Sequence, residues 1–277
     1  MYYGWSMTTL KVPGATLHYQ VQGRGPVLLI IMGGSGDADA ASGIVGHLSS
    51  RYTVVTYDRR GLSRSTLDDP SEPMSIEQHS EDAHHVLAAV TSDPAFVLGT
   101  SLGALIALDM VARHPGQVRL LVAHEPPVPA LLPEAERADA KRFQRILENG
   151  PAGPEWTELM RVIAVNHADV EDGVTIPRPG PQQLANATFF RERDAPVAHR
   201  YEHDLDALET VSDRIIAVGG EKSREAFPHR STRALADRLG TAFVEFPGDH
   251  AGFATRPRAF ADRLAQVLTE ASPSLGK

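Results

Sequence analysis

Strand-like apolar segments alternate with helix-like segments along this chain, and that alternation constrains the fold more than any other feature. Short runs rich in Val, Ile, Leu and Tyr are typical of strands, while longer segments with helical spacing separate them. The predicted strands of the first half are "TLHYQV" (16–21), "PVLLIIM" (26–32), "YTVVTYD" (52–58), "AFVLGT" (95–100) and "VRLLVAH" (118–124). Strands that alternate with helices form a parallel sheet with helices on both faces, so we predict an α/β fold.

Local signals support the predicted helices. The segment 39–50 has helical spacing, and Ser75 with Gln78 three residues later forms a capping-box pattern before the next helix. The segment "LGALIALDMVAR" follows the strand 95–100 directly, and Pro115 ends it.

The alternation stops at about residue 126 and returns at about residue 209. The stretch between is rich in proline and helical segments and has no convincing strand. Afterwards come a strand "RIIAVGG" (214–220), a helix 232–239, a strand "AFVEFPG" (242–248) and a helix 258–270. We therefore predict one core domain, residues 1–127 and 209–277, with a helical cap inserted over 128–208. A separate helical domain is the alternative.

Composition restricts the partners. The 277 residues carry a net charge of −8 and include no cysteine, so a disulfide, a thiolate metal site and a cysteine nucleophile are excluded. A negative chain is a poor partner for nucleic acid, and the longest apolar run is far too short to cross a bilayer. The start of the chain lacks the pattern of a signal peptide. We expect a cytoplasmic protein that acts on a small molecule without nucleic acid or membrane; a homodimer is left open.

The stretch "GTSLG" (99–103) lies where a predicted strand turns directly into a predicted helix. Such a turn strains the backbone at Ser101, and a side chain at position 99 or 103 would collide with the strand or the helix. This strand–turn–helix context is the one that the G-x-S-x-G nucleophile elbow requires. A chance Gly/Ser turn is the alternative.

A serine nucleophile needs a base, and His250 is the best placed of the twelve histidines. It lies in "FPGDHAGF", after the last predicted strand, and therefore at the same edge of the sheet as Ser101. The alternative is a generic loop histidine. His79, His84 and His85 share one predicted helix, where we expect them to be exposed.

Four motifs together resemble the α/β-hydrolase family over nearly the whole chain. They are "IIMGGSG" (30–36), "YDRRGLSRS" (57–65), "GTSLGA" (99–104) and "PGDHAGF" (247–253). The resemblance implies a mostly parallel eight-stranded sheet with helices on both faces and an inserted helical cap. It also implies that Ser101 is the nucleophile and that His250 is the general base, later the general acid.

The orienting carboxylate departs from the family pattern. In most members it follows the first strand after the cap, where this chain has Ser223, and a serine cannot stabilise an imidazolium by its charge. Glu125 ends the strand beside the elbow strand, and certain haloalkane dehalogenases are similar in placing a glutamate there. We predict the triad Ser101–His250–Glu125. An exposed strand-end glutamate is the alternative for Glu125.

Three other carboxylates fit the role of the orienting acid less well. Glu221 and Glu225 are out of phase with the family position, and Asp249 is a sequence neighbour that seldom reaches the adjacent ring.

The family resemblance also implies an oxyanion hole built from backbone N–H groups. Leu102, after the nucleophile, and Gly34, in the loop after residues 26–32, are the predicted donors. Many members begin that loop with His-Gly, and this chain has Met32 instead. We expect Met32 to line the substrate site beside Leu102.

Other motifs receive structural interpretations. Asp58, Arg59 and Arg60 are expected to fix a loop by ion pairs and a turn. The spacing of His199 and His203 could ligate a metal on a helix, but no glutamate follows the first histidine as in H-E-x-x-H, so we predict no metal and no cofactor. The aromatic residues Phe189, Phe190 and Tyr201 could face substrate or form the core of the cap.

These features predict a serine esterase of the carboxylic ester hydrolase class (EC 3.1.1) that cleaves an ester or lactone of a small to medium apolar substrate through an acyl-enzyme on Ser101. The family's haloalkane dehalogenases and epoxide hydrolases use an aspartate at the elbow, so the serine argues against both. Two alternatives remain. The same site could catalyse C–C, thioester or perhydrolase chemistry, or the chain could be a non-catalytic ligand-binding homologue.

Overall fold

The computed structural model describes residues 6–150 and 154–271, so the first five residues of the chain and its last six lie outside the description. In the described residues, nine strands form one sheet rather than the predicted eight. They are β1 (Ser6–Val12), β2 (Ala15–Gly23), β3 (Val27–Ile31), β4 (Thr53–Tyr57), β5 (Thr66–Leu67), β6 (Ala95–Thr100), β7 (Val118–His124), β8 (Ile215–Gly220) and β9 (Ala242–Phe246). The strands predicted from sequence differ from these bounds by two residues at most; β1 and the two-residue β5 were not among the predictions.

The strand order is β1-β2-β4-β3-β6-β7-β8-β9, and β5 pairs with β2 beside this path. From β4 to β9 every pairing is parallel, as predicted, whereas β1, β2 and β5 pair antiparallel. The carboxyl ends of β3, β6, β7, β8 and β9 therefore lie along one edge of the sheet.

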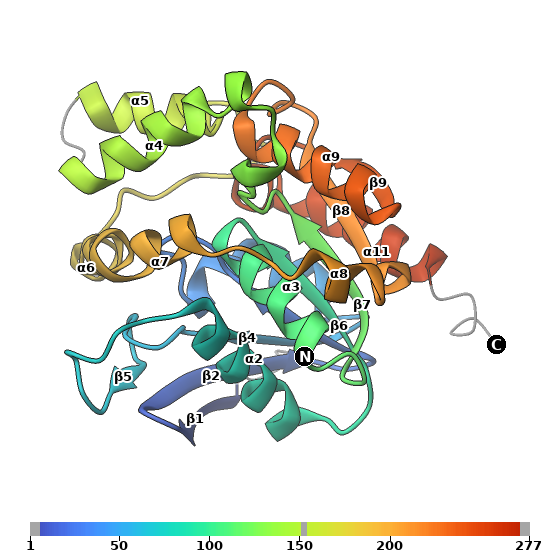
Figure 1. Ribbon diagram of the computed structural model, residues 1–277. Coiled ribbons are helices and arrows are strands. Elements are labelled where there is room, and N and C mark those ends of the chain that lie inside the picture. Colours follow the sequence, from blue (N-terminus) through green and yellow to red (C-terminus); the bar gives the residue numbers. More distant parts are fainter. Residues whose placement is uncertain (1–5, 151–153, 272–277) are drawn as a thin grey trace.

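Helices cover both faces of the sheet (Figure 1). One face carries α2 (Ile76–Val90), α3 (Leu102–Arg113), α8 (Leu205–Glu209) and α9 (Phe227–Leu239), and the other carries α1 (Ser42–Leu48), α10 (Gly252–Thr255) and α11 (Pro257–Glu270). Ser75 caps α2 as predicted, since its side chain accepts from the N–H of Gln78. The helix α9 begins five residues before the predicted 232–239, because Pro228 in its first turn suits a helix start.

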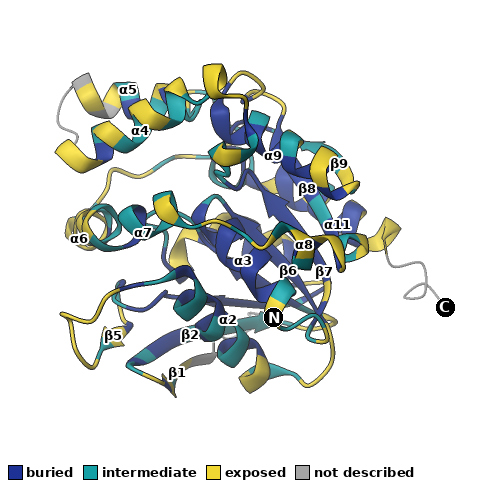
Figure 2. Cartoon of the chain, in the orientation of Figure 1, coloured by how far each residue is buried: buried dark blue, intermediate teal, exposed yellow. Residues whose placement is uncertain are grey.

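Residues 128–208, the inserted segment, contain no strand in their described part. Their helices are α4 (Ala138–Asn149), α5 (Pro154–Val162), α6 (Pro181–Phe189), α7 (Ala195–Arg200) and most of α8, with a π-helical turn (Phe190–Asp194) between α6 and α7. The first four lie together on the left of Figure 1, and their described residues are mostly exposed or of intermediate exposure, whereas α3 is buried (Figure 2).

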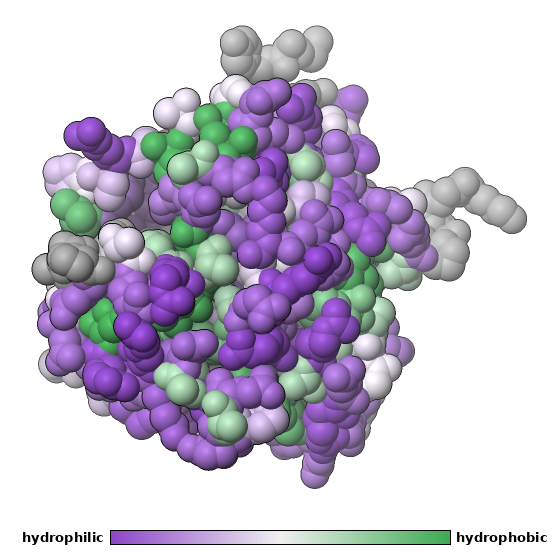
Figure 3. All heavy atoms as spheres, turned by 90° about the horizontal axis from the view of Figure 1, so that it is seen from above, coloured by the Kyte–Doolittle hydropathy of each residue, from purple (hydrophilic) through white to green (hydrophobic). Residues whose placement is uncertain are grey.

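The surface is mainly hydrophilic, with small separate groups of hydrophobic residues on the face shown in Figure 3. In the described part, Leu184 is the only large hydrophobic side chain that is well exposed. None of the described helices has the length and apolar character that crossing a membrane requires.

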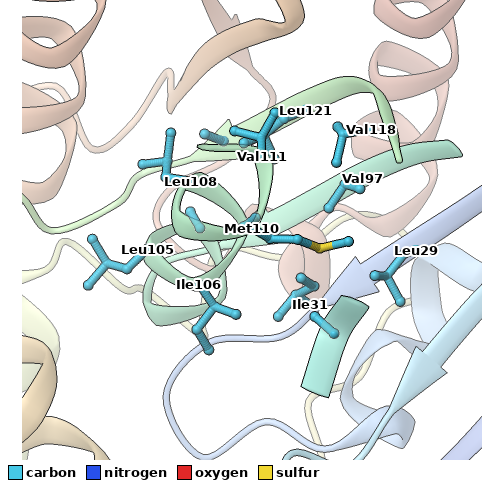
Figure 4. Packing of buried hydrophobic residues seen from close by; sticks show 14 of the residues in the cluster. Leu29, Ile31, Val97, Leu105, Ile106, Leu108, Met110, Val111, Val118 and Leu121 are labelled. Carbon is cyan, nitrogen blue, oxygen red and sulfur yellow. The ribbon is translucent and has the colours of Figure 1, made fainter. Parts of the chain in front are cut away.

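The core follows from the pleat of the parallel strands. Alternate residues of β3 enter opposite layers: Leu29 and Ile31 pack toward α3, and Leu28 and Ile30 pack toward α1 and α11. Both sets are apolar because both faces of a parallel sheet are buried. Figure 4 shows the first layer, in which side chains of α3 lie against β3, β6 and β7. This packing fixes the first turn of α3, where Ser101 lies.

Candidate active site

Ser101 lies at a sharp bend between β6 and α3. Its φ of 52° and ψ of −118° are outside the regions that non-glycine residues favour. A Cβ at Gly99 would lie 2.5 Å from the carbonyl oxygen of Gly103, and a Cβ at Gly103 would lie 2.0 Å from the carbonyl oxygen of Ile31. The collisions predicted for these two positions therefore exist, and glycine at both lets strand, helix and loop approach this closely.

The sheet register brings Ser101 beside Glu125. The last residues of β6 and β7, Thr100 and His124, are paired. The N–H of Ser101 donates to the carbonyl oxygen of His124 at 2.8 Å, and the N–H of Glu125 donates to Val218 in β8 at 2.9 Å. The backbone bends at positions 101 and 125 are thus neighbours at the same edge of the sheet.

Glu125 and His250 form a direct contact. Glu125 Oε2 lies 2.5 Å from His250 Nδ1, with the carboxylate fully buried and the imidazole 10% exposed. Burial alone would raise the pKa of Glu125, but the hydrogen bond and charge of His250, aided by Ser223, lower it to about 2. An ionised carboxylate only accepts, so Nδ1 donates the proton of this bond, and Nε2 is the ring nitrogen that does not bind the carboxylate.

Three groups therefore hold the Glu125 carboxylate. Besides His250, the N–H of Gly220 donates to Oε1 at 2.8 Å, and the Ser223 hydroxyl donates to the same oxygen. Ser223 is fully buried at the position where the family resemblance led us to expect the acid. Its side chain binds the carboxylate that lies at the end of the neighbouring strand.

The other carboxylates near this edge have different surroundings. Asp249 accepts from the backbone N–H of Asn166 at 2.7 Å and of Ala251 at 2.8 Å. It therefore ties the inserted segment to the loop that carries His250. Glu221 and Glu225 are exposed. Of the acids considered, only Glu125 contacts the ring of His250 among the described residues.

Ser101 is half-buried, and its Oγ has no hydrogen-bond partner in the described part of the chain. In particular, no hydrogen bond joins Oγ to His250 Nε2. Hydrogen bonds between nucleophile and base are often long in unliganded sites and tighten when substrate binds. The hydroxyl is therefore not committed to any structural bond.

The loop after β3 lies directly against the bend at Ser101. A Cβ at Gly33 would lie 2.8 Å from Ser101 Cβ and 3.0 Å from the nitrogen of Leu102. The backbone N–H groups of Gly34 and Leu102 have no acceptor among the described residues. Two free N–H groups beside the hydroxyl are the arrangement that an oxyanion hole needs.

Met32, predicted to line the substrate site, is only 3% exposed. Its side chain packs with Leu28 and Ile30 in the layer that α1 and α11 cover. A side chain in that layer faces the core, so the packing does not support the prediction that Met32 lines the substrate site.

The segment after β4 forms the expected turn and ion pairs. Arg60 pairs with Asp82 at 2.6 Å, and Asp58 pairs with Arg64 at 2.7 Å. Arg59 differs from both, because its guanidinium reaches the loop after β3. It also pairs with Asp194 of the inserted segment, which contacts His79.

The prediction that His79 is exposed is wrong. Its side chain is 1% exposed, since the contact with Asp194 lies under the inserted segment. That partner is 115 positions away in sequence, so helical periodicity could not reveal it.

His124 is a buried histidine that the sequence analysis did not single out. Its ring centre lies 6.3 Å from that of His250 and 5.3 Å from that of Phe260. Neither ring nitrogen has a partner among the described residues. Burial lowers the pKa of His124 to about 4, so the ring is neutral behind the Glu125–His250 pair.

Glu81, His84 and His114 form the one group in the described part whose ligand atoms, within 4.8 Å of one another, could share a metal ion. The rings of His84 and His114 are stacked 3.8 Å apart and nearly parallel, at 8°. A bound ion lies close to the plane of each imidazole that ligates it, and parallel planes share no such position. Hydrogen bonds account for these side chains instead, His84 with Gln117 and His114 with Glu81.

His199 and His203, whose spacing could have placed them on one helix face, do not share a helix, because α7 ends at Arg200 and His203 lies beyond it. His199 packs edge-on against Phe143, and Tyr201 donates to Asp109 in α3. Phe190 packs into the inserted segment, with Leu147 and Leu159. These contacts are structural, and no hydrogen bond joins any of these described residues to Ser101.

Comparisons with known proteins agree with this fold. A family model described as alpha/beta hydrolase fold matches residues 26–172. The chain is 41% identical to the hydrolase YraK of Bacillus subtilis, covering 94% of this chain and 95% of YraK. It is 27% identical to RutD of Caulobacter segnis, covering 95% and 99%, and the name of RutD assigns it provisionally to carbamate hydrolysis.

A solved structure of a bacterial membrane phospholipase A has a similar fold. It superposes with a TM-score of 0.76 at 20% identity, over 98% of this chain and 88% of that one.

Proposed function

Because the chain belongs to the α/β-hydrolase fold family, we propose that it is a serine hydrolase that cleaves a carboxylic ester or lactone of a small to medium apolar substrate. One observation carries this proposal: the buried Glu125 holds His250 by its Nδ1, at the edge of the sheet where Ser101 bends out of β6. A serine, a histidine and a carboxylate at adjoining strand ends are the elements of a hydrolytic triad.

In the proposed acylation, Ser101 Oγ attacks the substrate carbonyl carbon while His250 Nε2 takes the hydroxyl proton. The Glu125 carboxylate stabilises the imidazolium that results. The N–H groups of Gly34 and Leu102 bind the negative oxygen of the tetrahedral intermediate. His250 then returns the proton to the leaving oxygen as the C–O bond breaks, which leaves an ester on Ser101.

Deacylation repeats these steps with water. His250 Nε2 removes a proton from the attacking water, and the second tetrahedral intermediate uses the same two N–H groups. Its collapse returns the proton to Ser101 Oγ and releases the acid. We propose that the inserted segment acts as a cap over this site, because Asn166 is bound to Asp249, next to the base.

A fluorophosphonate probe combined with a series of p-nitrophenyl esters of rising acyl length tests the proposal. The wild-type chain is expected to be labelled and to hydrolyse the esters, and Ser101→Ala is expected to lose both. Absence of labelling in a folded wild type would contradict the proposal and favour the ligand-binding alternative.

The related chemistries are separated in the same screen. A p-nitrophenyl carbamate is included because of the name of RutD, and a thioester and a C–C substrate test the remaining reactions. Labelling of Ser101 with poor turnover of every ester would retain the nucleophile and overturn the ester assignment.

A further inference from the structure

We infer that Arg59 is a positioning residue for the oxyanion hole, and that Asp194 of the inserted segment holds it in place. The inference rests on the proposed function, because it concerns the backbone donors of the same site. Neither side chain is a member of the triad.

The guanidinium of Arg59 binds main-chain carbonyl oxygens of the loop after β3. Its Nη1 donates to the carbonyl oxygen of Met32 at 2.5 Å, and its Nη2 donates to that of Gly34 at 2.5 Å. One guanidinium thus holds the peptide before the Gly33–Gly34 peptide and the peptide after it. The planar, rigid fork of an arginine suits this, whereas a lysine has a single point of attachment.

Two further bonds fix Gly33, one on each of its two peptides: its N–H is part of the Met32–Gly33 peptide and its carbonyl oxygen is part of the Gly33–Gly34 peptide. The N–H of Gly33 donates to Thr100 Oγ1 at 3.1 Å, and the carbonyl oxygen of Gly33 accepts from Gly36 at 2.9 Å. In a trans peptide the C=O and the following N–H point in opposite directions, so the N–H of Gly34 points away from Gly36. The direction of the proposed oxyanion donor therefore depends on bonds that Arg59 supports.

Asp194 supplies the charge that Arg59 needs. Arg59 Nη2 lies 2.9 Å from Asp194 Oδ2, and the two side chains are 1% and 0% exposed. The other charged residues of this segment have partners of their own: Asp58 pairs with Arg64, and Arg60 pairs with Asp82 of α2. Without Asp194 the guanidinium would be a buried charge with no counter-ion, which is strongly unfavourable.

Asp194 is itself held as an ionised group. Its second oxygen, Oδ1, lies 3.2 Å from His79 Nε2. Burial alone would raise its pKa, but His79 and Arg59 together lower it. The carboxylate therefore bridges His79 of α2 and Arg59 of the segment after β4.

Because Asp194 belongs to the inserted segment, its ion pair with Arg59 links that segment to the proposed oxyanion hole. Asp194 ends the π-helical turn between α6 and α7, and such irregular turns occur frequently at functional sites. A displacement of α6 and α7 from the core breaks the ion pair and releases Arg59. The inserted segment thus contributes to the oxyanion hole although it supplies none of its donors.

The variant Asp194→Asn tests the inference because it keeps the shape of the side chain and removes its charge. We expect kcat for a p-nitrophenyl ester to fall about tenfold or more, since losing one oxyanion donor outright costs about 10²–10³ in rate. KM is expected to change little. The affinity for a trifluoromethyl ketone, which forms the oxyanion on Ser101, is expected to fall by a similar factor.

Tyr201→Phe is the matched control, because it removes another hydrogen bond between the inserted segment and the core, that with Asp109. It is expected to leave kcat and ketone affinity unchanged. Arg59→Lys is the second variant; it keeps the charge and is expected to lose kcat as Asp194→Asn does. Thermal unfolding of all three identifies any variant that fails to fold.

Wild-type kcat and ketone affinity in a folded Asp194→Asn and a folded Arg59→Lys would overturn the inference and leave the triad proposal intact. An equal loss in Tyr201→Phe would also overturn it, because anchoring of the segment in general would then explain the effect. A wild type without turnover or labelling would instead refute the proposed function.

Discussion

Ser101 and Glu125 both have backbone conformations that non-glycine residues seldom adopt, with φ of 52° and 49°, and they are bonded through a shared neighbour. The N–H of Ser101 donates to the carbonyl oxygen of His124, the residue before Glu125. A non-glycine residue in such a region costs about 1–3 kcal/mol and persists only where the surroundings over-determine it. The proposed nucleophile and its proposed acid are therefore two strained positions in one hydrogen-bonded unit.

Glu125→Gln is expected to lower kcat by about 10³–10⁴, because the amide can neither stabilise the imidazolium nor hold its tautomer. Steady-state kinetics on a p-nitrophenyl ester measures this. Asp249→Asn and Glu221→Gln are the controls, since neither side chain contacts His250 among the described residues, and both are expected to change kcat by less than about threefold. Activity near wild type in Glu125→Gln would remove Glu125 from the triad.

Adding Ser223→Asp to Glu125→Gln is expected to restore part of the lost kcat. Ser223 Oγ reaches the oxygen of Glu125 beside the one that binds His250, so an aspartate there brings a carboxylate close to the same ring. Ser223→Asp alone is expected to lower activity, since two buried carboxylates would share one site. A double variant no faster than Glu125→Gln would show that position 223 cannot orient the ring.

Gly103→Ala is expected to lower the free energy of unfolding by about 1–3 kcal/mol or more, because the new Cβ would meet the carbonyl oxygen of Ile31 at 2.0 Å. Urea unfolding measures the loss, and fluorophosphonate labelling is expected to slow as well. Gly46→Ala is the matched control: it is in α1 with nothing near its Cβ, and it is expected to gain about 0.5–1 kcal/mol. Equal effects of the two changes would contradict the elbow geometry.

His124→Leu is expected to make the protein less sensitive to acid. Burial lowers the pKa of His124 from 6.5 to about 4, so between these values the unfolded chain binds a proton that the folded chain does not. Stability therefore falls as pH decreases through this window, by about 1.4 kcal/mol per pH unit for one such group. Urea unfolding of both proteins at several pH values measures the pH-dependent difference, which is expected to grow as the pH falls from 6.5 to 4 and to be constant above pH 6.5. Parallel curves from pH 4 to 7 would contradict the buried neutral ring.

The sequence predicts what depends on local pattern. The parallel strands, the bend at Ser101 and the helix cap at Ser75 each follow from residues a few positions apart, and the structure contains all three. The extra strands escape prediction because β5 has only two residues and β1 lacks a strong alternation. The contact of Glu125 with His250 agrees with the predicted pairing, although it spans 125 positions, since strand order alone places both at one edge.

Contacts that need a particular partner could not be predicted. The pairing of Arg59 with Asp194 joins residues 135 positions apart, and nothing in "YDRRGLSRS" distinguishes an arginine that fixes its own loop from one that reaches another. The sequence pattern identifies Ser223 only by the absence of the usual acid. A serine hydroxyl one strand away from Glu125 is able to donate to its carboxylate, and this is the sequence signal for the bond between them.

The position of the acid also affects how this chain can evolve. Because Glu125 carries the charge, the turn at residues 220–223 contributes only an amide and a hydroxyl, both neutral and short. The exposed residues of that turn, Glu221 and Lys222, have no hydrogen bond to the carboxylate among the described residues. The rim beside Ser101 can thus diversify toward new substrates while the contacts of Glu125 with His250, Gly220 and Ser223 stay in place.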